Sequence, residues 1–153
     1  MALIIRRPGA DERDELHELW FRSVRATHVF LSEDDILFYA PFVAAALASD
    51  LEVWAVYDHA GAAAGFMALG VPDGLGKKWK LEALFIDPDK SRQGFGTCLV
   101  EHAVALKGPL ILDVNEQNPN AKAFYTRLGF TETGRSPLDG TGRPFPLIHM
   151  EMA

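Results

Sequence analysis

Two glycines separated by one residue, Gly94 and Gly96, form the clearest chemical signal in the sequence. They follow an apolar run that ends at Ile86, and a stretch with helical character comes after them. Lys90 and Arg92 stand just before the first glycine. A strand–turn–helix connection of this kind directs several backbone N–H groups and the positive end of a helix dipole at one point. Because glycine lets a ligand approach the backbone closely, the pattern predicts a phosphate-binding loop.

Two other phosphate-binding motifs fit this segment less well. A Walker loop requires Gly-Lys-Ser or Gly-Lys-Thr, and neither triplet occurs in the sequence. A dinucleotide fingerprint requires a third glycine, where Leu99 stands. Asp113 follows at roughly the spacing of a ribose-binding acid. However, the motif lies in the middle of the chain, and little sequence remains after it for a second half-domain. We therefore do not favour a nucleoside triphosphate or a dinucleotide as the ligand.

Composition limits the class of protein and its partners. The sequence has 153 residues, 48% of them hydrophobic and 24% charged, which predicts one globular domain over residues 1–153. No apolar run approaches the roughly 20 residues of a membrane span. The N-terminal residues do not form a signal peptide, so we expect a cytoplasmic protein without a membrane partner. The net charge of −6 argues against nucleic acid. The five histidines and the single Cys98 lack the spacing of a metal site.

The alternation of apolar runs and helical patterns predicts an α/β fold around a mixed sheet. The expected strands cover residues 3–6, 51–57, 62–69, 78–86, 110–114, 130–135 and 146–152. The expected helices cover residues 11–26, 33–48, 93–106 and 119–128, and Pro41 is expected to kink or divide the second one. The connection from strand 78–86 through a helix to strand 110–114 predicts a right-handed crossover between parallel strands.

Two motifs resemble those of the GCN5-related N-acetyltransferase (GNAT) superfamily. Residues 84–88 (LFIDP) followed by residues 92–96 (RQGFG) are similar to the family's acetyl-CoA pyrophosphate loop. Residues 118–130, which read NPNAKAFYTRLGF, are similar to its later N-x-x-A…FY…LGF segment. The order of elements agrees with the family over essentially the full length. Residues 114–118 (VNEQN) and 133–136 (TGRS) further resemble one bacterial branch, the YjaB type.

The resemblance implies an acetyl-CoA-dependent N-acetyltransferase that moves an acetyl group directly to a primary amine of a small molecule or peptide. It also implies a single GNAT-like sheet in which strands 78–86 and 110–114 splay apart to hold the acyl-CoA. Phe85 and Ile86 are expected to contact the pantetheine arm, and Asn118 either bonds the cofactor or caps a helix. The implied cofactor-binding residues are Leu84, Phe85, Ile86, Ser91, Arg92, Gln93, Gly94, Phe95, Gly96, Thr97, Asn118 and Tyr125. Valine at position 94 or 96 is expected to weaken cofactor binding and to preserve the fold.

The same resemblance implies catalytic roles. The backbone N–H of Leu84 would stabilise the oxyanion, and the phenol of Tyr125 would protonate the departing thiolate. Lys80 stands where many members of the family carry a Glu or His base, and Ser91 stands where the loop usually begins with Arg or Gln. Glu82 is our candidate for the general base. The acceptor is expected to meet His28, Lys80, Asp113 and Glu116.

Some alternatives stay open at this point. Lys80 and Ser91 are also compatible with a non-catalytic acetyl-CoA-binding or regulatory module. The transferred group is acetyl or another short acyl group. The base is Glu82, Asp113, Glu116, His28 or a water chain. A homodimer also remains open.

Overall fold

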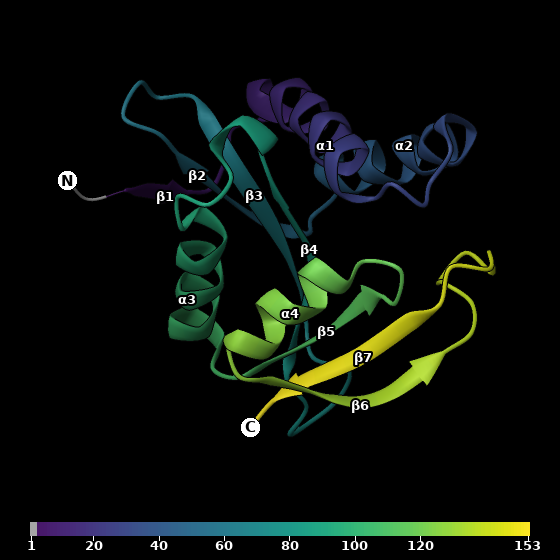
Figure 1. Ribbon diagram of the computed structural model, residues 1–153. Helices are drawn as coiled ribbons and strands as arrows, with labels where there is room; N and C mark the ends of the chain where they lie inside the picture. Colours follow the sequence, from purple (N-terminus) through teal and green to yellow (C-terminus); the bar gives the residue numbers. More distant parts are fainter. Residues whose placement is uncertain (1–2) are drawn as a thin grey trace.

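The computed structural model describes residues 3–153, which form a seven-stranded mixed sheet with helices on both faces (Figure 1). The strands stand in the order β1-β2-β3-β4-β5-β7-β6. Their bounds are β1 Ile4–Arg6, β2 Glu52–Tyr57, β3 Ala63–Gly70, β4 Trp79–Ile86, β5 Leu110–Asn115, β6 Phe130–Ser136 and β7 Leu147–Met152. The α/β class and the expected strands are confirmed, with ends that differ by one residue or none.

Four α-helices and two short 3₁₀ helices connect the strands. Their bounds are η1 Ala10–Glu12, α1 Arg13–Thr27, α2 Glu33–Ala48, η2 Pro88–Lys90, α3 Phe95–Lys107 and α4 Pro119–Arg127. The idea that Pro41 divides the second helix is wrong, because α2 runs through it. The hydrogen bond that proline cannot donate would go to the carbonyl of Leu37, which is exposed and open to water. Within residues 3–153, no helix has the length and apolar character needed to span a membrane.

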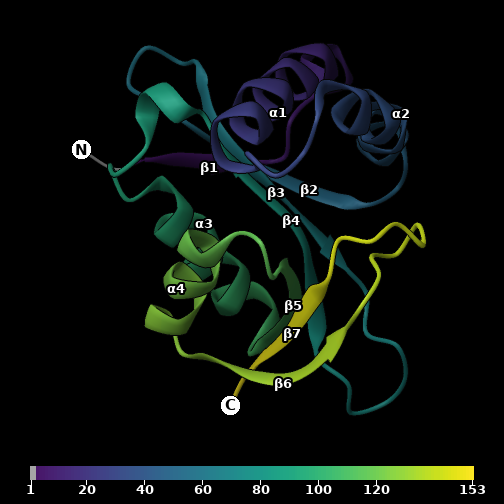
Figure 2. The same cartoon turned by 45° about the vertical axis from the view of Figure 1, so that its right-hand side comes forward.

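The sheet separates two hydrophobic cores. On one face, α3 and α4 pack on the sheet through a cluster that includes Leu99, Leu110 and Phe130. On the other face, α1 and α2 bury Leu16, Trp20 and further apolar side chains. Figure 2 shows the two helix pairs on opposite sides of the strands. The apolar stripe of α1 and the buried strands therefore account for the layers.

Strands β4 and β5 are parallel but pair only at their beginnings. The register joins Trp79 to Leu110, Lys80 to Ile111 and Leu81 to Leu112, and no pair follows. Beyond this point β4 stays paired with β3, and β5 stays paired with β7. The two halves of the sheet diverge here (Figure 1). The expected splayed parallel pair is therefore present, and we call this point the fork.

A β-bulge in β4 lies beside the fork. Ala68 of β3 pairs with Ala83 and Leu69 pairs with Leu81, so Glu82 is an extra residue in β4. A bulge changes which way the following side chains point and leaves one residue outside the regular pairing. Lys80 and Glu82 line one cavity, and the bulge brings Phe85 to the same side of the sheet, although a residue at an odd-numbered position would face away from them in a regular strand.

Gly96, in the first turn of α3, allows a close approach between helices. A β-carbon at this position would lie 3.2 Å from Cζ of Phe124 in α4 and 3.7 Å from Cγ1 of Ile86. The expectation that Gly96→Val would preserve the fold therefore does not agree with the packing. A β-carbon at Gly94 would meet open space, but the φ of 81° would strain any side chain there, so the two glycines serve different purposes.

We predict that Gly96→Val lowers the free energy of unfolding by about 1–3 kcal/mol, the usual cost of overpacking. Chemical denaturation without cofactor measures this change. Gly140→Val is the matched control, because Gly140 has no neighbour within 4 Å and an ordinary φ. An equal loss of stability in both variants would contradict the packing role of Gly96.

Candidate active site

The predicted phosphate-binding segment, residues 91–97, has the backbone geometry of an anion site. Gly94 is the N-cap of α3 with φ of 81°, and Arg92 also has a positive φ of 63°. The first helical hydrogen bond is donated by Cys98 to the carbonyl of Gly94. Within residues 3–153, the backbone N–H groups of residues 92–97 have no hydrogen-bond partner. A row of free donors at a helix N-terminus suits a pyrophosphate.

The side chains of this segment divide into two sets. Ser91, Arg92 and Gln93 are exposed, so both their side chains and their backbone are open to a ligand. The side chain of Phe95 is buried in the core under α3. Only the backbone N–H of this residue is therefore open to the cofactor. Gly96 and Thr97 are partly buried in the first turn of α3. The predicted segment is thus largely a backbone site.

The fork directs the free backbone groups of β4 toward β5. The N–H of Asp87 donates to the carbonyl of Ala64 in β3, at 2.8 Å. Since backbone groups alternate along a strand, the N–H groups of Leu84 and Ile86 point to the opposite edge, where β5 has left. The N–H of Leu84 is therefore left without a strand partner at that edge.

Phe85 differs from the expectation that it contacts the pantetheine arm. Alternation along β4 turns its backbone groups to β3 and its ring to the α1 side of the sheet. The ring lies near Trp20 and His28, with centroid distances of 6.4 Å to each. Phe85 therefore lines the cavity on that side.

Tyr125 and Asn118 lie on the α4 side of the sheet. The ring of Tyr125 packs edge-on against Phe130, and burial raises the pKa of its phenol. The hydroxyl has no hydrogen-bond partner among the described residues, so the proton remains available. Asn118 caps α4, because its Oδ1 accepts from the N–H of Ala121 at 3.3 Å. Its side-chain nitrogen has no partner within residues 3–153 and is free to bond a cofactor.

The opposite side of the fork opens into a cavity of about 330 Å³ between α1, α2, β4, β5 and the loop before β7. We call it the acceptor pocket. Its apolar walls include Phe30, Leu31, Phe85, Phe145 and Leu147. Its polar side chains include His28, Lys80, Glu82, Asp113 and Asp139. The structure thus brings together His28, Lys80, Glu82 and Asp113, as the sequence predicted.

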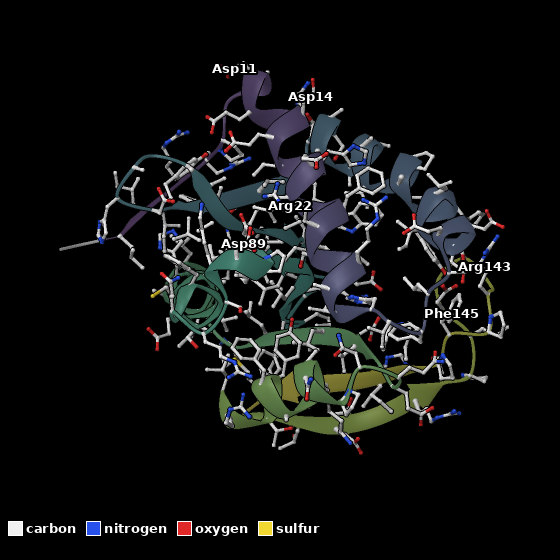
Figure 3. The ribbon with its side chains drawn as sticks, turned by 45° about the horizontal axis from the view of Figure 1, so that its top comes forward. Asp11, Asp14, Arg22, Asp89, Arg143 and Phe145 are labelled. Carbon is white, nitrogen blue, oxygen red and sulfur yellow. The ribbon has the colours of Figure 1, made fainter. Side chains whose placement is uncertain are left out.

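The loop over residues 137–146 closes one wall of the acceptor pocket, and sequence reasoning did not identify it. Tyr39 of α2 donates a short hydrogen bond to Asp139. Arg143 bonds Asp35 at the start of α2, at 2.9 Å. The ring of Phe145 lies 5.9 Å from that of Phe30. Figure 3 shows Arg143 and Phe145 beside α2. These contacts join positions about a hundred residues apart, so no local sequence pattern predicts them.

Both carboxylate oxygens of Asp113 are already bonded, one to Lys80 and one to His149, so Asp113 is not free to act as a base. Lys80 Nζ donates to its Oδ2 at 2.9 Å, and His149 Nδ1 bonds its Oδ1 at 2.5 Å. Burial alone would raise the pKa of Asp113, but the bonds from His149 and Lys80 outweigh it and lower the pKa. Burial opposes the charge of Lys80, yet Asp113 raises the pKa of this lysine. Both groups are therefore ionised at neutral pH.

Glu116 lies outside the acceptor pocket, contrary to expectation. Both of its carboxylate oxygens accept from Arg135, at 2.9 Å each, and this bond lowers the pKa of Glu116. It lines a different, shallow surface cavity with Pro119 and Lys122. The reason is alternation, because Asp113 and Asn115 of β5 face the acceptor pocket and the next residue turns away.

Glu82 is the carboxylate that remains unpaired in the acceptor pocket. Asp113 is bonded to Lys80 and His149, and Asp139 is bonded to Tyr39 and the backbone of its own loop. Glu82 has no hydrogen bond or ion pair to any side chain within residues 3–153. It is therefore free to meet a cationic ligand.

Ser136, His149 and Asp113 form a hydrogen-bonded row on the same side of the sheet. Ser136 Oγ lies 2.7 Å from His149 Nε2, which has the order of a serine-hydrolase triad. However, the backbone N–H of Glu116 donates to the carbonyl of Pro146, and alternation then directs the backbone of Leu147 to Ser136. The N–H of Ser136 is thus used by the sheet, and Pro137 has none. Without oxyanion donors, this row does not support acyl hydrolysis.

His28 presents a bare nitrogen at the acceptor pocket. The hydroxyl of Thr27 donates to the carbonyl of Ser23 at 2.8 Å, so it must accept from His28 Nδ1 at 2.8 Å. This bond places the proton on Nδ1 and leaves Nε2 as an acceptor. Burial lowers the pKa of His28 from 6.5 to about 4. His28 is therefore neutral at pH 7 and a weak base.

The burial of His28 predicts a pH-dependent stability. A histidine whose pKa is lower in the folded state than in the unfolded state contributes stability above pH 6.5 that is lost as the pH falls toward about 4. Denaturation of wild type and His28→Asn between these values measures the effect. The wild type should lose more stability than the variant over this range. If the free energies of unfolding of the two proteins change with pH in parallel, the lowered pKa of His28 is contradicted.

Comparisons with known proteins identify the family and the fold of this chain. The sequence model of the Acetyltransferase (GNAT) domain matches residues 49–132. The peptidyl-lysine N-acetyltransferase YjaB of Escherichia coli K12 is 39% identical over 157 residues, covering 98% of this chain and 97% of the relative. The solution structure of apo YjaB from E. coli superposes with a TM-score of 0.87 at 38% identity, covering 100% and 99% of the two chains.

A more distant structure shares the fold. The PaiA N-acetyltransferase of Thermoplasma acidophilum, solved in complex with coenzyme A, has a TM-score of 0.78 at 20% identity and covers 99% of each chain. The family match covers more than half of this chain and includes the fork and the phosphate-binding segment. The chain belongs to the GNAT acetyltransferase family and is an acetyl-CoA-dependent N-acetyltransferase.

Proposed function

We propose that this N-acetyltransferase acetylates the side-chain amine of lysine in peptides or proteins. The observation that carries the proposal is the acceptor pocket, which combines apolar walls with one unpaired carboxylate, Glu82. A lysine side chain is an aliphatic stem that ends in an ammonium, so it matches this arrangement. The relative YjaB, which matches 98% of this chain, bears the name of a peptidyl-lysine N-acetyltransferase.

The cofactor would enter from the side opposite the acceptor. The free N–H groups of residues 92–97 would hold the pyrophosphate, with Arg92 adding positive charge. The pantetheine arm would then lie along β4 at the fork, where Leu84 and Ile86 offer unpaired backbone groups. In this position the N–H of Leu84 would donate to the thioester oxygen, and its bond would strengthen as negative charge develops on that oxygen.

Glu82 would act as the general base for the acceptor. Its carboxylate would pair with the incoming ammonium and remove a proton directly or through one water molecule. Lys80 does not suit this role, because its bond to Asp113 keeps it protonated. The neutral amine would attack the thioester carbon, and the C–S bond would break as the amide forms.

Tyr125 would protonate the leaving thiolate. Burial raises the pKa of its phenol, so the group is protonated at any physiological pH. Its hydroxyl has no competing hydrogen bond within residues 3–153 and is free to donate to sulfur. Its packing against Phe130 holds the ring in place.

We predict thiol release from acetyl-CoA when a lysine-containing peptide is added, and much less with the same peptide carrying norleucine in place of lysine. Glu82→Gln should lower kcat by about 10²–10⁴-fold, the range for loss of a general base. Cofactor binding, measured by calorimetry, should remain. Turnover of small amines without turnover of the peptide would refute the peptide acceptor, and full activity of Glu82→Gln would refute the base.

Tyr125→Phe tests the acid. The variant retains the ring, so cofactor affinity and stability should change little, while kcat falls by about 10²–10⁴-fold. The loss should appear in kcat more than in KM, because the interaction forms mainly in the transition state. Phe124→Leu on the same helix is a control for packing alone. Activity of Tyr125→Phe within about threefold of wild type, under conditions where chemistry limits kcat, would leave Tyr125 with a packing role.

A further inference from the structure

A hydrogen-bonded row of polar side chains crosses four strands at the base of the fork. Lys80 Nζ in β4 donates to Oδ2 of Asp113 in β5 at 2.9 Å. His149 Nδ1 in β7 lies 2.5 Å from Oδ1 of the same carboxylate, and its Nε2 lies 2.7 Å from Oγ of Ser136 in β6. Asp113 and His149 are also direct partners in the register of β5 and β7. The row therefore fixes the Asp113 carboxylate with one oxygen bonded to Lys80.

Glu82 is a second carboxylate beside Lys80. Gly70 of β3 is the register partner of Lys80, and a β-carbon on Gly70 would lie 2.6 Å from Glu82 Oε1. Because directly paired residues share one face, with β-carbons about 4.5–5.5 Å apart, the Glu82 carboxylate lies close to the base of the Lys80 side chain. Burial lowers the pKa of Lys80, but the bond and charge of Asp113, and then the charge of Glu82, raise it. The flexible stem of Lys80 thus has two carboxylates to choose between.

The surroundings of the two carboxylates explain why Lys80 pairs with Asp113. The Asp113 side chain is 26% exposed and already held by His149, so the pair is partly shielded from water and its carboxylate needs little further ordering. Glu82 is an exposed residue, so water and salt would screen a pair with it more strongly. Without Asp113, however, Glu82 would be the carboxylate left beside Lys80.

We propose that Asp113, fixed by His149, is a positioning residue that holds the Lys80 ammonium away from Glu82; this inference rests on the proposed function. A pair between Lys80 and Glu82 would occupy the carboxylate that is proposed to receive the substrate ammonium. The acceptor would then have to displace Lys80 before it could bind. In this role Asp113 acts through Lys80 and takes no proton from the acceptor.

Asp113→Val tests the inference, because valine suits a strand and offers Lys80 no oxygen. The kcat/KM for a lysine peptide should fall by at least about fivefold, which corresponds to roughly 1 kcal/mol for a partly exposed ion pair. The loss should appear mainly as a higher KM for the peptide, because Lys80 competes with the peptide for Glu82. A crystal structure of the variant should place Lys80 Nζ within about 4 Å of the Glu82 carboxylate.

Lys80→Met provides the rescue. Added to Asp113→Val, it removes the competitor, and the two substitutions together leave the net charge of the acceptor pocket unchanged. The double variant should therefore recover most of the kcat/KM that Asp113→Val loses. Lys78→Met is the matched control, because Lys78 pairs with Glu151, has a side chain 29% exposed compared with 34% for Lys80, and does not line the pocket. Added to Asp113→Val, it should recover nothing.

Chemical denaturation checks that each variant is folded, and Asp113→Ala replaces Asp113→Val if valine disturbs the sheet. The inference is overturned if Lys80 stays apart from Glu82 in the crystal structure of the variant, or if Lys80→Met recovers no activity. Glu82→Gln is measured in parallel. If it lowers kcat while Lys80 stays apart from Glu82, the positioning role is refuted and the proposed function stands. If Glu82→Gln is fully active, the proposed base is refuted, and with it any effect of Asp113 on catalysis through Glu82.

Discussion

The separation of β4 from β5 after Leu81 and Leu112 is the constraint on which the rest of the structure depends. Two neighbouring parallel strands normally satisfy each other's backbone groups, and an unpaired N–H is costly unless water or a ligand bonds it. The separation therefore creates a row of donors and acceptors in the middle of a sheet. In the proposed arrangement, it also lets a cofactor on the α4 side reach an acceptor on the α1 side.

Charge pairing determines which groups at this opening remain reactive. Lys80, Asp113 and His149 satisfy one another, and Asp139 is satisfied by Tyr39 and its own loop. Burial first, and then the bond to Asp139, raises the pKa of Tyr39 to about 12, so this phenol stays a donor. The pairing leaves Glu82 as the free carboxylate of the acceptor pocket. A single free anion in a partly apolar pocket favours an ammonium and discriminates against anionic ligands.

The two helix pairs support different parts of the proposed site. On one face, α3 and α4 approach closely over Gly96, which brings the phosphate-binding segment beside Tyr125 and Asn118. On the other face, α1 and α2 form the wall against which the loop over residues 137–146 is held. Arg22 of α1 bonds the buried Asp87 at 2.9 Å and thereby joins α1 to the turn that leads to the phosphate-binding segment. This ion pair thus joins a helix of the acceptor-pocket side to the turn before the predicted phosphate-binding segment.

The sequence by itself determined the order of helices and strands and the family, and it predicted the phosphate-binding segment, because each depends on local patterns such as the glycines at 94 and 96. It also indicated Glu82, Lys80 and Asp113 as neighbours, since strand periodicity places alternate side chains on one face. Only the tertiary structure decided which carboxylate is free, because that depends on His149 and Arg135 from other strands. It also decided that Glu116 lies outside the pocket and that Phe85 lines it. These outcomes depend on register, a bulge and contacts between distant residues such as Tyr39 and Asp139, which no local pattern encodes.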